Sequence, residues 1–137
     1  DRFLSRLRFN LDVGKFLKEV HELRALAHRL EKADLSASRI YRALKGFSAE
    51  SVTAFWLALD SEVARQHVQL YLERLRWVRT LVGGEFLKGL GVQPGPVYGR
   101  ILDRLLLARL DGRIHSVQEE EALARRLAAR LAKSDSA

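Results

Sequence analysis

Apolar residues recur three and four positions apart through most of the chain, which is the spacing of one face of an α-helix. The clearest run predicts one continuous helix over residues 13–33 and consists of Phe16, Val20, Leu23, Ala27 and Leu30. A second run predicts a long helix from Asp60-Ser61 to about residue 82, with the apolar positions Ala64, Val68, Tyr71, Leu75 and Val78. No segment shows the period-two alternation of β-branched residues that indicates a strand. The pattern therefore predicts an all-α protein.

Residues with capping and chain-breaking chemistry divide the rest of the pattern into shorter helices. Ser36, Ser48 and Ser116 each precede a run of helix-forming residues, and Glu119 follows Ser116 at the spacing of a capping box. Helix ends are expected where glycines and turn pairs stand, namely at Gly46, Gly83-Gly84 and Asp111-Gly112.

These signals predict an irregular multi-helix bundle of about seven to eight helices. The first helix is expected at residues 2–9, and a helix is expected after the loop at residues 91–99. The glycine pair at residues 83–84 separates two expected helical subdomains, a body at residues 1–82 and a tail at residues 83–137.

The composition is that of a folded domain. Hydrophobic residues make up 47% of the 137 residues, which excludes a disordered chain. Cysteine is absent, which excludes disulfides, thiolate metal sites and cysteine nucleophiles and makes a cytoplasmic location our expectation. No apolar run approaches the ~20 residues of a membrane span, and no secretory leader is visible. The chain begins at Asp1 and has no methionine, which we interpret as a piece of a longer protein.

The formal net charge is +7, and both halves of the chain contribute to it. A basic balance of this kind favours a polyanionic partner, with nucleic acid ahead of a membrane surface. The alternative is a solvated basic protein without such a partner.

The segment from Leu87 to Leu102 carries the most informative chemistry. Its glycines let the backbone approach a neighbour or a ligand closely, because no Cβ stands in the way; they are Gly89, Gly91, Gly95 and Gly99. A helix that starts directly after this loop would present unpaired N–H groups to a phosphate, with Lys88, Arg100 and Arg104 beside it. The other interpretation is a tight corner between helices, in which the glycines serve only close packing.

Aromatic residues stand among arginines in two further segments. Tyr41 and Trp77 are each flanked by arginines, which are Arg39, Arg42, Arg74, Arg76 and Arg79. If these rings or Tyr98 are exposed, they can stack on a base or a ribose. Their helical spacing also fits positions in the core.

No set of side chains in the sequence matches a catalytic or metal site. His21 and His28 stand seven residues apart, whereas two metal ligands on one helix stand three or four apart. The acidic residues are expected mostly on exposed helical faces or caps, with Glu119-Glu-Glu121 in the first turn of the last helix. We therefore expect no catalytic and no metal-binding residue in this chain.

The order of several segments is similar to that of one family. The segments are Ser38-Arg-Ile-Tyr-Arg-Ala-Leu-Lys-Gly-Phe-Ser-Ala-Glu50, Tyr71-Leu-Glu-Arg-Leu-Arg-Trp-Val-Arg79, Gly84-Glu-Phe-Leu-Lys-Gly-Leu-Gly91, Pro94-Gly-Pro-Val-Tyr-Gly-Arg-Ile-Leu102, Ala108-Arg-Leu-Asp-Gly112 and Gln118-Glu-Glu-Glu-Ala-Leu123. They resemble the C-terminal helical region of bacterial class II tRNA nucleotidyltransferases and the related poly(A) polymerases, most closely the long A-adding type. The resemblance covers about residues 36–127, and Pro-Gly-Pro-x-x-Gly followed by Leu-Asp-Gly is a fairly specific part of it.

The resemblance implies that the chain is the body and tail of such an enzyme, which hold the RNA. A catalytic head that uses Mg²⁺ and ATP or CTP, and a neck that selects the nucleotide, are implied in the same protein. The motifs of head and neck do not occur in this sequence. We therefore expect no cofactor in this part and no activity from it alone.

Our leading hypothesis is a non-catalytic domain that grips the backbone of tRNA, or of another RNA 3′ end, through helix N-termini and arginines. The predicted RNA-binding residues are Lys88, Gly95, Gly99, Arg100 and Arg104, followed by a second group of Arg39, Arg42 and Arg113. The alternative is a helical module that dimerises or docks on the catalytic half without touching RNA. It would bury Phe55, Trp56 and Leu59 in an interface.

Overall fold

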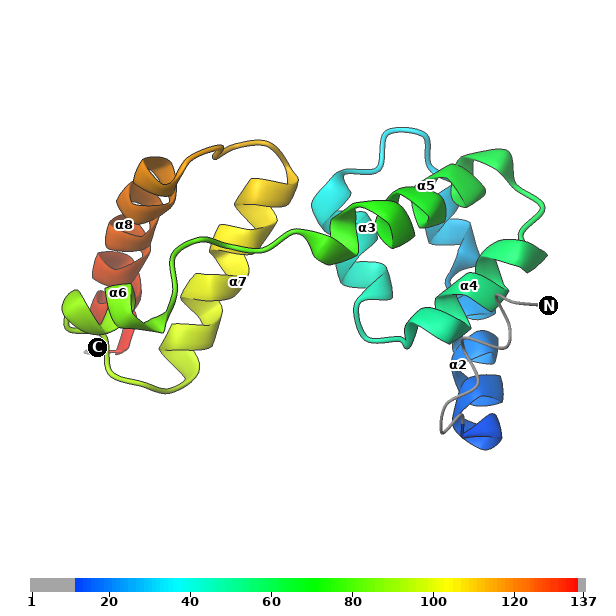
Figure 1. Ribbon diagram of the computed structural model, residues 1–137, viewed down its shortest axis with the longest axis horizontal. Coiled ribbons are helices and arrows are strands. Elements are labelled where there is room, and N and C mark those ends of the chain that lie inside the picture. The colour runs from blue at the N-terminus through cyan, green and yellow to red at the C-terminus, as the bar shows by residue number, and fades with distance from the viewer. Residues whose placement is uncertain (1–11, 136–137) are drawn as a thin grey trace. The chain divides into compact units, whose positions relative to one another are not determined.

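The computed structural model describes residues 12–135, and within that range the regular structure is entirely helical (Figure 1). The α-helices are α2 (Val13–Ala25), α3 (Ala37–Leu44), α4 (Ala49–Ala58), α5 (Glu62–Glu73), α6 (Gly84–Gly89), α7 (Pro96–Leu110) and α8 (Val117–Asp135). Two 3₁₀ helices accompany them, η1 (Ala27–Glu31) and η2 (Leu75–Trp77). The predicted all-α class is confirmed, and the helix expected at residues 2–9 lies outside the described residues.

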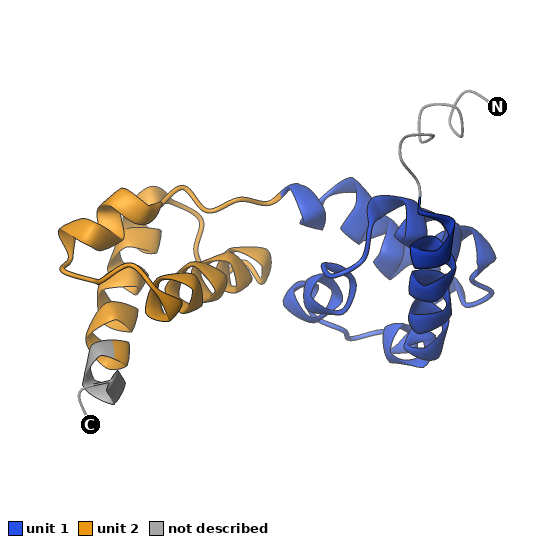
Figure 2. Ribbon diagram, turned by 90° about the horizontal axis from the view of Figure 1, so that it is seen from below, with its two compact units in different colours: residues 1–77 blue, residues 78–137 orange. Residues whose placement is uncertain are grey.

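The chain divides into two compact units, residues 1–77 and residues 78–137 (Figure 2). The division comes earlier than the glycine pair at residues 83–84. Its physical reason is Val82, whose side chain is buried in the core of the second unit together with Leu87 and Ile101. The connector before the glycine pair is therefore part of the second unit.

The first unit departs from the predicted helix over residues 13–33. That helix ends at Ala25, and the chain continues as the tighter η1. The change occurs at Leu26, whose N–H donates to the carbonyl of Leu23 three residues back, at 3.1 Å. Leu23 and Leu30 are both fully buried, so the apolar stripe is correct and the continuous α-helix is wrong.

The predicted helix starts of the first unit are confirmed by their hydrogen bonds. Ser36 Oγ accepts from the N–H of Arg39 at 3.4 Å, and Ser48 Oγ accepts from the N–H of Ser51 at 3.3 Å. Ser61 Oγ accepts from the N–H of Ala64 at 3.2 Å. These side chains replace hydrogen-bond partners that the first turn of a helix lacks.

Of the predicted ends of these helices, one is confirmed and one is wrong. The helix after Ser36 ends at Leu44 with Lys45 as its C-cap, directly before Gly46. By contrast, α5 ends at Glu73 rather than near residue 82. Arg74 leaves the helical region with φ −130° and ψ −56°, and η2 follows. Leu75 is nevertheless buried, as are Val68 and Tyr71 of α5.

The second unit is built from α6, α7 and α8. Its core consists of Val82, Leu87, Ile101, Leu105, Ala124 and Leu127. Ser116 opens α8, since its Oγ accepts from the N–H of Glu119 at 3.1 Å, as the capping box predicts. The turn at Asp111-Gly112 is also confirmed, with Gly112 at φ +73°.

A buried carboxylate joins the connector to α8. Glu120 is fully buried, although the sequence places it among acids expected to be exposed. Its Oε1 accepts from the N–H of Leu81 at 2.9 Å and of Val82 at 3.1 Å, and its Oε2 accepts from Arg109 Nε at 2.7 Å. The ion pair with Arg109 satisfies the buried charge. This cluster fixes the C-terminal part of α7 against α8.

Candidate nucleic-acid interface

The N-terminus of α7 is the centre of the predicted phosphate site. The helix begins at Pro96, inside the loop, and not after Gly99 as the sequence suggested. Pro96 suits the first helical position because its φ is fixed near the helical value and it has no N–H to satisfy. Gly95 precedes it with φ +152°, and Gly91 has φ +84°, so both positions require glycine.

No side chain caps the start of this helix, where Pro96 has no N–H and the N–H of Tyr98 donates to the carbonyl of Gly95 at 3.1 Å. Gly95 provides no capping side chain, and the first turn of α7 contains no acidic residue. The partial positive charge of the helix N-terminus is therefore not neutralised within that turn.

The glycines distinguish between the two interpretations of the loop. A Cβ at Gly89 or Gly99 would meet no atom within 4 Å, and neither residue has a positive φ. Close packing inside the unit therefore requires glycine at neither position. A tight contact exists only at Gly84, where a Cβ would come within 3.2 Å of the Tyr98 ring.

Tyr98 has a structural role in this corner. Its hydroxyl donates to the carbonyl of Gly84, and the residue is half-buried. The hydrogen bond joins the start of α6 to the first turns of α7. Tyr98 is thus not an open surface for a stacked base.

The predicted cations of the second unit are exposed. Lys88 lies on α6, and Arg100 and Arg104 lie one helical turn apart on α7. None of the three forms an ion pair with another residue of the described range. Asp103, also exposed, stands between the two arginines in the sequence and is the acid nearest to them along α7.

The second group of predicted residues stands on other parts of the chain. Arg113 is exposed three residues after the end of α7, a helix of 15 residues that spans about 22 Å at 1.5 Å per residue. Its N–H donates to the carbonyl of Ala108 at 2.9 Å and so closes the end of the helix. Arg39 and Arg42 are exposed on α3, in the first unit.

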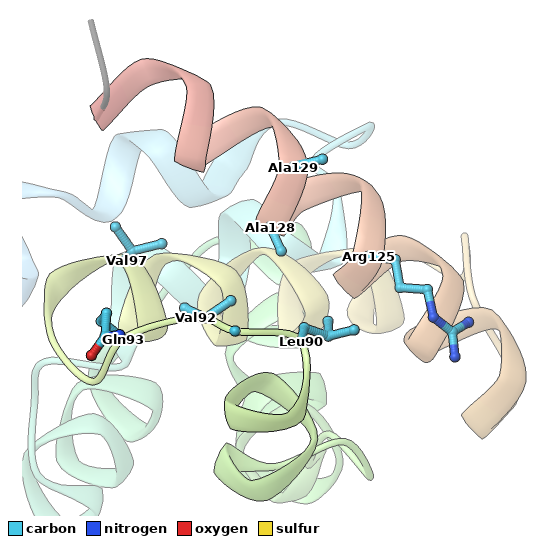
Figure 3. Close-up of a pocket in the computed structure, with 8 residues that line it drawn as sticks. Leu90, Val92, Gln93, Val97, Arg125, Ala128 and Ala129 are labelled. Atoms are coloured by element: carbon cyan, nitrogen blue, oxygen red, sulfur yellow. The ribbon is translucent and has the colours of Figure 1, made fainter.

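An open groove of about 430 Å³ lies beside the loop that precedes α7 (Figure 3). Its lining residues are Leu90, Gly91, Val92, Gln93, Val97, Arg125, Ala128 and Ala129. Most of these are apolar, and the one charged member, Arg125, is paired with Glu121 at 3.9 Å. The groove is therefore mainly apolar, and Arg125 and Gln93 supply its side-chain donors.

A second buried acid, Glu19, was not predicted from the sequence. Glu19 on α2 accepts hydrogen bonds from Ser48 Oγ and Ser51 Oγ, both at 3.0 Å, and from the backbone N–H of Ser48. Burial raises the pKa of the Glu19 carboxyl, but these hydrogen bonds and the charge of Lys15 outweigh it and leave the pKa below its ordinary value. No local pattern signals this acid, because its partners lie about 30 residues away.

The residues proposed for a docking interface are buried or half-buried in the first unit. Phe55 is buried in the core of its own unit and is not available to a partner, so that assignment is wrong. Trp56 and Leu59 are half-buried. Among residues 12–135 there is no cluster of three or more histidine or acidic residues placed to bind a metal, and no helix there is long and apolar enough to cross a membrane.

Most of the chain is similar in sequence to a known protein. A stretch of 97 residues, 71% of the chain, is 39% identical to the A-adding tRNA nucleotidyltransferase of Geobacter sulfurreducens. The chain is similar to a tRNA nucleotidyltransferase. It spans 11% of the length of that relative. No protein-family model and no solved structure matches the chain.

Proposed function

We propose that the chain is a non-catalytic, C-terminal RNA-binding part of a tRNA nucleotidyltransferase that adds A or CCA, or of a poly(A) polymerase. It holds the RNA backbone while nucleotides are added to the 3′ end. The observation that carries the proposal is the first half of α7, where Arg100 and Arg104 are exposed beside an uncapped helix N-terminus. The similarity to an A-adding tRNA nucleotidyltransferase supports the choice of RNA.

The physical argument begins with the charges on α7. Two arginines one turn apart can each donate to a phosphate, and the helix N-terminus adds partial positive charge. Gly99 leaves a stretch of backbone uncovered next to Arg100, where a sugar–phosphate chain can approach. Contacts of this kind recognise the shape of a folded RNA rather than its sequence.

The proposal leaves nucleotide transfer to other parts of the protein. In this proposal Mg²⁺ and ATP or CTP are bound by a catalytic head elsewhere in the protein. We expect this part alone to be inactive. We also expect the protein to act in the cytoplasm, with its own head and neck and the tRNA as its partners.

The test is an anisotropy titration of labelled tRNA that lacks its 3′ CCA, over a series of salt concentrations. We expect contacts with about four to six phosphates and a steep loss of affinity with salt. Arg100→Glu with Arg104→Glu should abolish binding and leave the helicity unchanged. The matched control is Arg24→Glu with Arg29→Glu, which makes the same charge change at two exposed positions of the first unit.

Two results would contradict the proposal. Undiminished affinity in the α7 variant would show that Arg100 and Arg104 do not bind the RNA. An equal loss of affinity in the control variant would show that the effect comes from net charge alone. A DNA duplex of matched length serves as the second ligand, and equal affinity for it would mean a generic basic surface.

A second function has one structural observation in its favour. Val13 and Leu17 lie one turn apart on α2, and they are 61% and 60% exposed. An exposed apolar strip of this kind suits docking on the catalytic half or dimerisation. This function predicts association that is insensitive to salt. Sedimentation of the chain over a range of concentrations tests it, because this function predicts a concentration-dependent dimer and the RNA-binding proposal does not require one.

A further inference from the structure

One aromatic side chain of the described range is markedly exposed, and it stands among arginines. Trp77 is 59% exposed at the end of the first unit, in η2. The other tryptophan, Trp56, is half-buried on α4, and Tyr41 packs on Tyr71 with ring centroids 6.1 Å apart. An exposed indole contributes little to the core of its own unit, so its surface is available to a ligand.

The surroundings of Trp77 favour an anionic, aromatic partner. The guanidinium of Arg76 lies over the Trp77 ring, with Cζ 4.2 Å from the centroid, and Arg74 is exposed at the start of the same turn. A single guanidinium covers one face of a planar ring, and more than half of the residue stays exposed despite it. A nucleobase can stack on the remaining surface while arginine charge attracts its phosphate.

We infer that Trp77 is a stacking platform for an unpaired nucleobase of the bound RNA. The inference rests on the proposed function, because it assigns a second kind of contact with the same class of ligand. The Trp77 contact requires an unpaired base on which the indole can stack, whereas the contacts of the α7 arginines require only phosphates. Trp77 therefore contributes affinity for single-stranded segments, and this part of the affinity does not depend on salt.

The chain allows a direct optical test, because it contains two tryptophans. Trp56→Phe leaves Trp77 as the only indole, and it removes a buried Nε1 that has no hydrogen-bond partner in the described structure. We expect the fluorescence of this variant to be quenched on titration with a short single-stranded oligoadenylate and to change little with an RNA duplex of matched length. Circular dichroism checks that the variant keeps its helices.

The second measurement uses anisotropy and does not depend on that variant. Trp77→Ala should weaken oligoadenylate binding about 5- to 100-fold without changing the slope of affinity against salt, and Trp77→Phe should restore most of the loss. Leu57→Ala is the matched control, because Leu57 is 63% exposed on α4 and has no ring to stack.

The outcomes separate this inference from the proposed function. Unchanged affinity of Trp77→Ala, together with loss of binding in the α7 variant, overturns the stacking role alone. Equal quenching by single strand and duplex also overturns it. If Trp77→Ala instead changes only the sedimentation of the chain, Trp77 is a protein contact and the inference fails. A wild-type chain that binds neither tRNA nor the oligoadenylate overturns the proposed function and the inference together.

Discussion

Gly99 occupies a position where neither its backbone angles nor its neighbours require a glycine. It lies in the first turns of α7, is exposed, and has open space where a Cβ would be. Glycine in a helix costs about 0.5–1 kcal/mol relative to alanine, so the chain is less stable here than it needs to be. The RNA contact that we propose at this position would account for the glycine, because it needs bare backbone.

Gly99→Ala tests that explanation with two opposed effects. The substitution should raise the free energy of unfolding by about 0.5–1 kcal/mol, because alanine favours the helix and meets nothing. It should also weaken tRNA binding, because the added methyl group covers the backbone. Thermal unfolding and anisotropy measure the two effects, and Gly46→Ala, also in open space, is the control for binding. A stabilised variant with full affinity would show that Gly99 does not touch RNA.

Glu19 makes the first unit sensitive to acid. Its folded pKa lies below the ordinary 4.5, so the unfolded chain takes up the proton first as pH falls. The stability that Glu19 contributes is therefore present above about pH 4.5 and is lost as the pH falls through the folded pKa.

Glu19→Gln should flatten this part of the pH profile. The amide keeps the size of the side chain but cannot ionise, so the acid-induced loss of stability should become smaller. Urea unfolding at a series of pH values between neutral and about 3 measures it. An unchanged slope would assign the acid sensitivity to other carboxylates.

At the scale of elements, α7 depends on Glu120 for its position. The carboxylate holds Arg109 of α7 and the N–H groups of Leu81 and Val82 from one place on α8. Glu120→Ala leaves two amides and a partly buried guanidinium without their acceptor. The second unit should lose about 3–5 kcal/mol, the usual cost of breaking a buried ion pair.

The loss of Glu120 should affect the thermal stability of the second unit and not that of the first. Thermal unfolding of Glu120→Ala should show a lower midpoint for the second unit and an unchanged one for the first. Glu119→Ala is the matched control, since Glu119 is exposed and its carboxylate interacts with Ser116 alone among the described residues. If the two variants unfold alike, the buried cluster does not hold the unit together.

How well each helix could be predicted from the sequence depends on how far apart along the chain the interacting residues stand. The starts of α3, α4, α5 and α8 were predictable, because each serine caps an amide three residues away. The break at Leu26 was not, since apolar residues seven apart look the same whether the chain between them is one helix or two. The buried Glu120 was not either, because its partner amides lie nearly 40 residues earlier.

The candidate site shows the same limit. Exposure of Lys88, Arg100 and Arg104 follows from helical periodicity and was predictable. The start of α7 at Pro96 was missed, because the loop was extended to the last glycine of the motif. Whether a glycine is needed for packing depends on atoms from other elements, and only the folded structure distinguishes Gly84 from Gly99.

At the scale of the whole molecule, the predicted cations are divided between two units. Arg39 and Arg42 belong to residues 1–77, whereas Lys88, Arg100, Arg104 and Arg113 belong to residues 78–137. An RNA that meets both groups therefore links two separately packed bodies, and the chain between them is the connector that follows Trp77.

That connector gives Glu120 a mechanical consequence. If both units held one RNA, as the proposed function implies, tension between them would pass along the backbone from Trp77 to Leu81 and Val82. The amides of these two residues are held by a single carboxylate on α8. Glu120 and the buried side chain of Val82 thus anchor the connector to the second unit together, and a pull between the units must break both contacts before the connector lengthens.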